Sequence, residues 1–183
     1  MSAPRIIAIS GSLRTGSFNR KLLALLVEQA RAKGAEVDVV DLKVLVLPIY
    51  DGDIEAQGLP PPAVELRERI SKAQGLLISS PEYNASIPGS LKNAIDWASR
   101  GGPNVFKGKW AALAGASPGM FGTVRMQAHL RQSLTHLGMN LLPDQFLVSH
   151  ADQAFTEEGR LKDESRLKSL EGLVTGLIAR IQG

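Results

Sequence analysis

The chain has 183 residues, 44% of them hydrophobic and only 5% aromatic, which suits one globular domain over residues 1–183 with a mainly aliphatic core. Its 21 basic and 18 acidic residues leave a formal net charge of +3, and no run of Lys and Arg exceeds two residues, so the clustered charge of a nucleic-acid-binding protein is missing. The absence of cysteine excludes disulfides, thiolate metal sites and cysteine nucleophiles, and no apolar stretch reaches the ~20 residues of a membrane helix, so we expect a cytoplasmic protein.

Apolar patterning along the chain predicts strands and helices in regular alternation. Helices are expected where apolar residues recur at three- and four-residue spacing, and strands where short apolar runs end at turn residues. The segment 45–50 contains a proline among apolar residues and is expected to be a packed loop. In chain order, the predicted elements are a strand at 5–10, a helix at 17–33, a strand at 36–42, a helix at 62–72, a strand at 75–79, a helix at 90–99, a strand at 110–114, a helix at 123–137, a strand within 140–148 that Pro143 interrupts, and a helix at 165–181.

The loop 11–19, between the first strand and the first helix, has the chemistry of a phosphate site. It offers two glycines, three hydroxyl side chains and the charge of Arg14, and it ends where the free N–H groups and dipole of a helix favour an anion. Ser17 stands where a Walker A loop requires Lys, and the G-x-G-x-x-G fingerprint of dinucleotide-binding folds is absent. An ordinary helix cap by Ser17 or Thr15 is the alternative.

A second loop, 80–89, follows the third strand and suits a planar group with a polar edge. Tyr83 can stack on a ring, while Glu82 and Asn84 can hydrogen-bond a heterocycle. The alternative is a plain turn in which Tyr83 covers the core. A third, glycine-rich loop at 115–122 follows the fourth strand and is either a further ligand loop or a flexible connection.

Strict alternation of strands and helices predicts an α/β fold, a parallel sheet with helices on both faces. Five strands with a phosphate loop after the first suggest the flavodoxin-like three-layer sandwich, with strand order 2-1-3-4-5. In that topology FMN binds at the switch point between the first and third strands, so the loops 11–19 and 80–89 would be neighbours in space. Together they indicate a flavin mononucleotide site.

Three stretches carry a resemblance to a known family: GSLR followed by SFN within 11–19, SPEYN followed by SIPG within 80–89, and LKNAIDW at 91–97. In this combination the chain resembles the NADPH-dependent FMN reductase family, which includes bacterial chromate, quinone and azo-dye reductases. The resemblance extends over nearly the whole chain. The chain departs from the family pattern in the third loop, where Met120, Phe121 and Gly122 stand in place of the paired glycines that members often have.

Carried over residue by residue, the resemblance implies a set of contacts to FMN and an oligomeric protein. Members commonly form homodimers or homotetramers, and Trp97, which lies off the apolar stripe of its helix, is expected either at such an interface or at the edge of the core. The residues implied to contact the phosphate and ribityl chain are Ser12, Arg14, Ser17, Phe18 and Asn19; those implied to border the isoalloxazine are Pro81, Glu82, Tyr83 and Asn84; Ser117 and Gly119 are implied to approach from the third loop.

The resemblance implies an enzyme in which NADPH passes a hydride to FMN and a small acceptor then takes two electrons, in a ping-pong cycle. A quinone, chromate, an azo compound or free flavin could serve as acceptor. The alternative is an FMN electron carrier or redox-responsive binding protein, but a carrier benefits from an acidic docking face and this chain is net basic. A phosphotransferase or phosphatase lacks the required Lys and a catalytic pair of carboxylates. The three histidines show no metal-site spacing.

Overall fold

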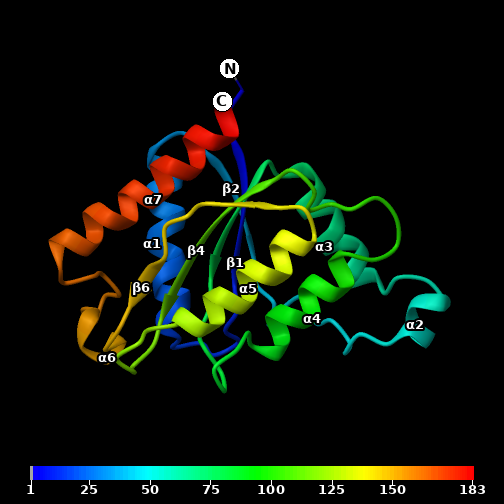
Figure 1. The fold of residues 1–183 in the computed structure, drawn as a ribbon, viewed down its shortest axis with the longest axis horizontal. Coiled ribbons are helices and arrows are strands. Elements are labelled where there is room, and N and C mark those ends of the chain that lie inside the picture. Colours follow the sequence, from blue (N-terminus) through cyan, green and yellow to red (C-terminus); the bar gives the residue numbers. More distant parts are fainter. Residues whose placement is uncertain (1) are drawn as a thin grey trace.

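The computed structural model describes residues 2–183, within which six strands form one parallel sheet (Figure 1). The strands follow the order β2-β1-β3-β4-β5, and β6 pairs with β4 beyond the point where β5 ends. The order expected from the sequence is therefore confirmed. The strands are β1 (Arg5–Ser10), β2 (Glu36–Val40), β3 (Gly75–Ser79), β4 (Trp110–Ala116), β5 (Asn140–Leu141) and β6 (Phe146–Val148).

Helices cover both faces of this sheet (Figure 1). Helices α1 and α7 pack on one face, and α3, α4 and α5 pack on the other. The short helices α2 and α6 are absent from the sequence-based prediction, since neither is long enough to show an apolar stripe. The helices are α1 (Phe18–Ala32), α2 (Gly52–Ala56), α3 (Pro61–Lys72), α4 (Gly89–Ala98), α5 (Val124–His136), α6 (Ala151–Ala154) and α7 (Glu164–Gln182).

The single strand expected within 140–148 is replaced by two short ones, β5 and β6, which pair with β4 in turn. Pro143 lies between them, and pairing stops there because proline has no N–H to donate to a sheet. The guanidinium of Arg131 on α5 holds the intervening turn, donating to the carbonyl oxygens of Leu142 and Asp144 at 2.7 Å each. The turn is thus ordered although it leaves the sheet.

Successive side chains of each strand enter opposite cores, as the pleat requires. In β1, Ile6 and Ala8 pack beneath α1 and α7, whereas Ile7 and Ile9 pack beneath α3, α4 and α5. All four are buried. With both faces covered, the sheet fixes the positions of the loops that leave its carboxyl ends.

Trp97 belongs to the core and not to a subunit interface. Its side chain is fully buried, its indole Nε1 donates to the carbonyl oxygen of Pro48 at 2.7 Å, and its ring meets Tyr50 edge-on with 5.1 Å between centroids. The expected packed loop 45–50 is therefore present, and it covers the side of α4 that faces away from the sheet. The apolar stripe of α4 predicts packing against the sheet but does not indicate packing against the loop 45–50.

Strand β2 forms one edge of the sheet, and arginine side chains bind its outward carbonyl groups. Arg31 of α1 donates to the carbonyl oxygen of Val37 at 3.1 Å, and Arg69 of α3 donates to that of Val39 at 2.9 Å. Unpaired edge carbonyls invite pairing with another chain, and side chains that cover them prevent it.

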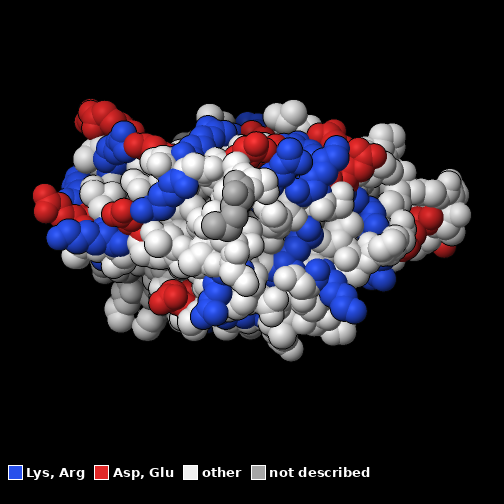
Figure 2. Space-filling model, turned by 90° about the horizontal axis from the view of Figure 1, so that it is seen from above, with Lys and Arg blue, Asp and Glu red and all other residues white. Residues whose placement is uncertain are grey.

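The end of the molecule that carries both termini lies at the amino-terminal ends of the strands (Figure 1). Figure 2 shows this end from above, with basic and acidic side chains interspersed over the surface and not gathered by sign. The carboxyl ends of the strands, where the candidate ligand loops lie, are on the opposite side of the molecule.

Candidate functional site

The three candidate loops pack directly against one another at the carboxyl edge of the sheet. The N–H of Gly11 donates to the carbonyl oxygen of Ser79 at 3.0 Å, and the N–H of Ser80 donates to that of Ala114 at 3.1 Å. A Cβ on Gly11 would lie 2.2 Å from Ser80 Oγ, and one on Gly115 would lie 2.8 Å from the Ser80 carbonyl oxygen. Glycine is required at both positions by this close approach. The predicted proximity of the loops is therefore confirmed.

The loop after β1 has free donors at the start of α1. Ser17 is the N-cap, its Oγ accepting from the N–H of Asn19 at 3.1 Å, so the cap that the sequence suggested is present. Within residues 2–183, the backbone N–H groups of Thr15, Gly16 and Phe18 have no acceptor, and the space beside the Gly16 Cα is open. A helix N-terminus with free N–H groups suits a phosphate group, so the cap and the anion site coexist here.

Asn19 joins the phosphate loop to the sheet and is almost completely buried. Its Nδ2 donates to the Ala116 carbonyl oxygen at 2.8 Å, while its Oδ1 accepts the Ala116 N–H at 2.8 Å and the Ser79 hydroxyl at 3.3 Å. Its amide thereby fixes the start of α1 against the ends of β3 and β4. The neighbouring Phe18 stacks on Phe155, with 5.8 Å between ring centroids. Both side chains position the loop from within.

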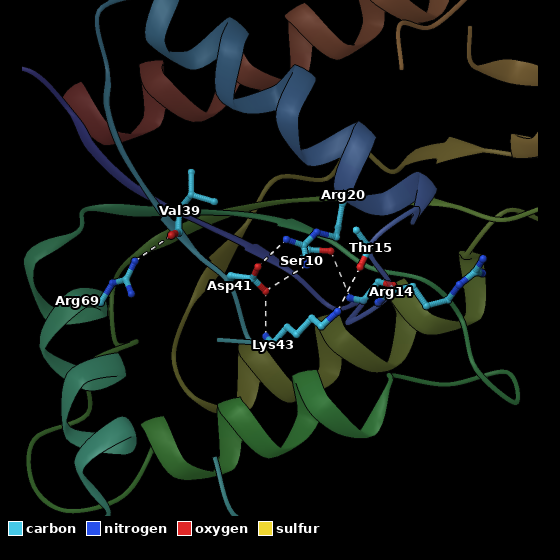
Figure 3. Close-up of polar contacts among 9 residues, drawn as sticks. Ser10, Arg14, Thr15, Arg20, Val39, Asp41, Lys43 and Arg69 are labelled. Atoms are coloured by element: carbon cyan, nitrogen blue, oxygen red, sulfur yellow. Dashed lines mark hydrogen bonds and ion pairs between the residues drawn. The ribbon is translucent and has the colours of Figure 1, made fainter. Parts of the chain in front are cut away.

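The remaining predicted residues of this loop differ in exposure. Ser12 is buried, and its Oγ accepts the N–H of Arg14 at 3.4 Å, which shapes the turn. Arg14 extends from the exposed rim of the loop (Figure 3). Of the five residues expected around a phosphate, Arg14 alone presents an exposed charged group.

The carboxylate of Glu82 is engaged with helix α5. It accepts the backbone N–H groups of Arg125 and Met126 at 3.0 and 3.1 Å and the Arg125 Nε at 2.7 Å, and its side chain is only 5% exposed. Burial opposes ionisation, but the hydrogen bonds from Met126 and Arg125 outweigh it and hold the pKa of Glu82 below its usual value. The carboxylate thus caps α5 and ties the second loop to it, leaving backbone groups as the polar contacts this residue can offer a ligand.

A tight hairpin at 83–86 forms the tip of the second loop. Tyr83 and Ser86 exchange backbone hydrogen bonds of 3.1 and 3.0 Å, and the central residues Asn84 and Ala85 have positive φ angles of 48° and 61°. This is the form of a type I′ turn, which Asn-Gly usually makes, so Ala85 is strained. Ser86 Oγ also lies 2.9 Å from Nδ1 of His129 on α5.

The hairpin presents Tyr83 to solvent with 47% of the residue exposed. Pro81 is buried beneath it. An exposed aromatic ring on a doubly anchored hairpin can lie against a planar group.

The third loop places Ser117 and Gly119 at the same edge. Ser117 Oγ accepts the Gly119 N–H at 3.1 Å, which forms a compact turn. Met120 and Phe121, which stand where paired glycines are frequent, are 65% and 61% exposed. They add apolar surface beside the loop.

Lys43 is a residue of this edge that the sequence analysis missed. It follows β2, and its Nζ donates to Thr15 Oγ1 at 3.2 Å across the phosphate loop (Figure 3). The predicted strand order could have indicated this residue, because in the order 2-1-3-4-5 the end of β2 lies beside the end of β1.

A hollow of about 490 Å³ lies beside the phosphate loop, between α1 and β2. Its apolar lining includes Leu23 and Val27, and its polar lining includes Arg20 paired with Asp41. Elsewhere in residues 2–183, no cluster of three His, Asp or Glu side chains could hold a metal ion, and no helix is long and apolar enough to cross a membrane.

Comparisons with known proteins agree with this geometry. Residues 4–153 match the family model described as NADPH-dependent FMN reductase. The chain is 40% identical to an NAD(P)H-dependent FMN reductase of Pseudomonas aeruginosa, covering 98% of this chain and 97% of the relative. It is 41% identical to an NAD(P)H:quinone oxidoreductase of Solanum tuberosum, covering 96% of this chain and 91% of the relative.

Solved structures show the same fold. The flavoenzyme NAD(P)H:(acceptor) oxidoreductase of Paracoccus denitrificans superimposes with a TM-score of 0.86 at 36% identity, covering 98% of both chains. A flavodoxin from the Archaea superimposes with a TM-score of 0.66 at 11% identity, covering 98% of this chain and 99% of that one, a likeness of fold alone. The expected flavodoxin-like architecture is confirmed.

Proposed function

Because the chain belongs to the NADPH-dependent FMN reductase family, we propose that it is an NAD(P)H-dependent oxidoreductase that binds FMN at the carboxyl edge of its sheet and reduces a quinone or another small acceptor. Bound FMN would supply the two-electron chemistry, while the protein supplies position and electrostatics. Chromate, azo compounds and free flavin are included among the proposed acceptors.

The observation that carries this proposal is the pairing of two complementary features on one edge. The free N–H groups of Thr15, Gly16 and Phe18 suit the phosphate end of FMN, and the exposed ring of Tyr83 suits the flat end. Asn19 and Glu82 hold these features in place through buried hydrogen bonds.

The test is the visible absorption spectrum of the protein supplied with FMN, before and after anaerobic addition of NADPH. A bound-flavin spectrum that bleaches supports the proposed reductase. Bound flavin that NADPH cannot reduce would instead favour an electron carrier, and a protein that binds no flavin would contradict the site assignment.

We infer a ping-pong order for the reaction, in which donor and acceptor would in turn occupy the surface beside the exposed ring of Tyr83. Initial rates measured over a grid of NADPH and quinone concentrations should give parallel double-reciprocal lines. Intersecting lines would show that both substrates bind together and would contradict this order.

We also propose a homodimer or homotetramer in the cytoplasm. Three large apolar side chains lie exposed within six residues: Val44, Val46 and Ile49 at 80%, 72% and 85%. The segment that carries them is well ordered, because the side chain of Asn93 bonds both the Pro48 carbonyl and the Tyr50 N–H at 2.8 Å. A rigid exposed apolar surface is typical of a protein interface. The lack of cysteine is compatible with a reducing compartment, which cell fractionation would test.

A further inference from the structure

We propose that Lys43 recognises a phosphomonoester dianion bound over the loop 11–19, a role that no motif in the sequence assigns to it. The inference rests on the proposed function, because it deepens the assignment of the same edge. The phosphate could be the 5′-phosphate of FMN or the 2′-phosphate of NADPH, which share this chemistry.

Lys43 reaches the loop from a different element. It lies in the connection after β2, whereas the loop connects β1 to α1, and its Nζ is 3.2 Å from Thr15 Oγ1 (Figure 3). Thr15 is adjacent to Gly16, beside which the structure is open. The ammonium group therefore lies next to N–H groups that have no acceptor within the described chain.

Asp41 determines where Lys43 lies. Its Oδ1 accepts the Lys43 N–H at 2.9 Å, and its carbonyl oxygen accepts the N–H groups of Val44 and Leu45 at 3.0 and 2.9 Å, which closes a helical turn. Arg20 of α1 binds the Asp41 carboxylate through both Nη atoms, at 3.2 and 2.5 Å. The start of α1 thus anchors both the phosphate loop and the turn that carries Lys43.

In this arrangement the ammonium group of Lys43 forms no direct ion pair. Burial opposes ionisation of Asp41, but the hydrogen bonds from Arg20 and from the Lys43 N–H hold its pKa below the usual value, so its negative charge is matched by Arg20. Elsewhere in the chain Lys33 and Lys92 form ion pairs with acidic side chains. Within residues 2–183, Lys43 has no such partner, and the one hydrogen bond of its ammonium group is to a neutral hydroxyl.

Arg14 belongs to the same loop and, like Lys43, forms no ion pair with an acidic side chain of the described residues. The ammonium group of Lys43 and the amino end of α1 lie beside the open space at Gly16, whereas the Arg14 side chain extends away from Lys43 (Figure 3). A phosphomonoester carries close to two negative charges at neutral pH and three acceptor oxygens, so it can accept from the Lys43 ammonium and from the free N–H groups of the loop together. A neutral ligand would lack the charge–charge attraction to Lys43.

The experiment compares Lys43→Gln with wild type, using full-length protein freed of flavin and titrated with FMN or riboflavin. The matched control is Lys107→Gln, which removes the same charge from an exposed residue at the opposite end of the sheet. Flavin fluorescence gives the dissociation constants. If the FMN phosphate is the ligand, Lys43→Gln should weaken FMN binding by about tenfold and leave riboflavin binding unchanged.

A second arm titrates the FMN-loaded protein with NADP⁺ and NAD⁺. Loss of about tenfold for NADP⁺ alone would assign Lys43 to the 2′-phosphate of the nucleotide instead. Unchanged binding of both FMN and NADP⁺ would overturn the proposal. So would an equal loss for riboflavin and FMN, because the effect would then be structural and not phosphate-dependent. Both arms measure binding, so they stay decisive even if NADPH fails to reduce the flavin.

Discussion

The carboxylate of Glu82, at the start of one candidate ligand loop, accepts the backbone N–H of Arg125 at 3.0 Å, at the start of α5. The two residues are separated by 43 positions in the sequence. The bond places a negative charge at the positive end of a helix and couples the hairpin at 83–86 to α5. Ser86 and His129 reinforce this coupling at 2.9 Å.

Replacement of Glu82 by Gln should lower the stability of the fold by about 2 kcal/mol at pH 7. In Gln one carboxylate oxygen is replaced by an NH₂ group, which donates and cannot accept hydrogen bonds. This group would face either the N–H donors of α5 or the guanidinium of Arg125. Urea unfolding followed by circular dichroism measures the change. Glu157→Gln is the matched control, since Glu157 is exposed, and a loss of equal size in both variants would contradict the capping role.

The contribution of Glu82 should also depend on pH. Its pKa in the folded protein lies below the usual value of 4.5, so its stabilising effect is present above that value and is lost as the pH falls through the lowered pKa. The stability difference between wild type and Glu82→Gln should therefore be largest near neutral pH and shrink in acid. Unfolding curves between pH 7 and pH 3 test this, and a difference that does not change with pH would contradict it.

Replacement of Ala85 by Gly should stabilise the protein by about 1 kcal/mol. Ala85 has a φ angle of 61°. This conformation is energetically unfavourable for a residue with a Cβ atom, whereas glycine adopts it without strain. The control is Ala128→Gly on the exposed face of α5, which should instead destabilise by a similar amount. Thermal unfolding of the two variants should therefore shift in opposite directions, and a shift in the same direction would show that Ala85 is unstrained.

Loss of the two arginines that cover β2 should promote association through the sheet edge. In the double variant Arg31→Gln and Arg69→Gln, the carbonyl groups of Val37 and Val39 would be free to pair with another chain. Light scattering during mild heating should rise earlier than in wild type. The double variant Lys72→Gln and Lys107→Gln removes the same charge without exposing the edge, and equal scattering from both would contradict the role of the arginines.

The strand order and the meeting of three loops could be predicted because they follow from local patterns and from the rules of parallel sheets. The partners of Glu82 and Asn19 could not, since each side chain bonds a residue far along the chain whose place depends on the completed fold. The structure shows these hydrogen bonds within the chain, and the expected contacts of both residues with FMN stay predictions.

Two other features could not be predicted from the sequence. The left-handed conformation of Ala85 has no compositional signal, because alanine favours helices and glycine is the usual residue at such a position. The burial of Trp97 depends on the irregular loop 45–50, which covers the outer side of α4 and has no periodicity. Tertiary contacts, and not local propensity, decide both.

The exposed apolar segment should be the first place where a single charge breaks an oligomer. Val46→Asp introduces a carboxylate at a side chain that is 72% exposed, so the fold should tolerate it, whereas burial of that charge in an interface would be costly. Light scattering coupled to size-exclusion chromatography should report an oligomer for wild type and a smaller species for the variant. Val64→Asp on α3, at 40% exposure, is the matched control and should keep the mass of wild type. A monomeric wild type, or a variant of unchanged mass, would show that this segment forms no subunit interface.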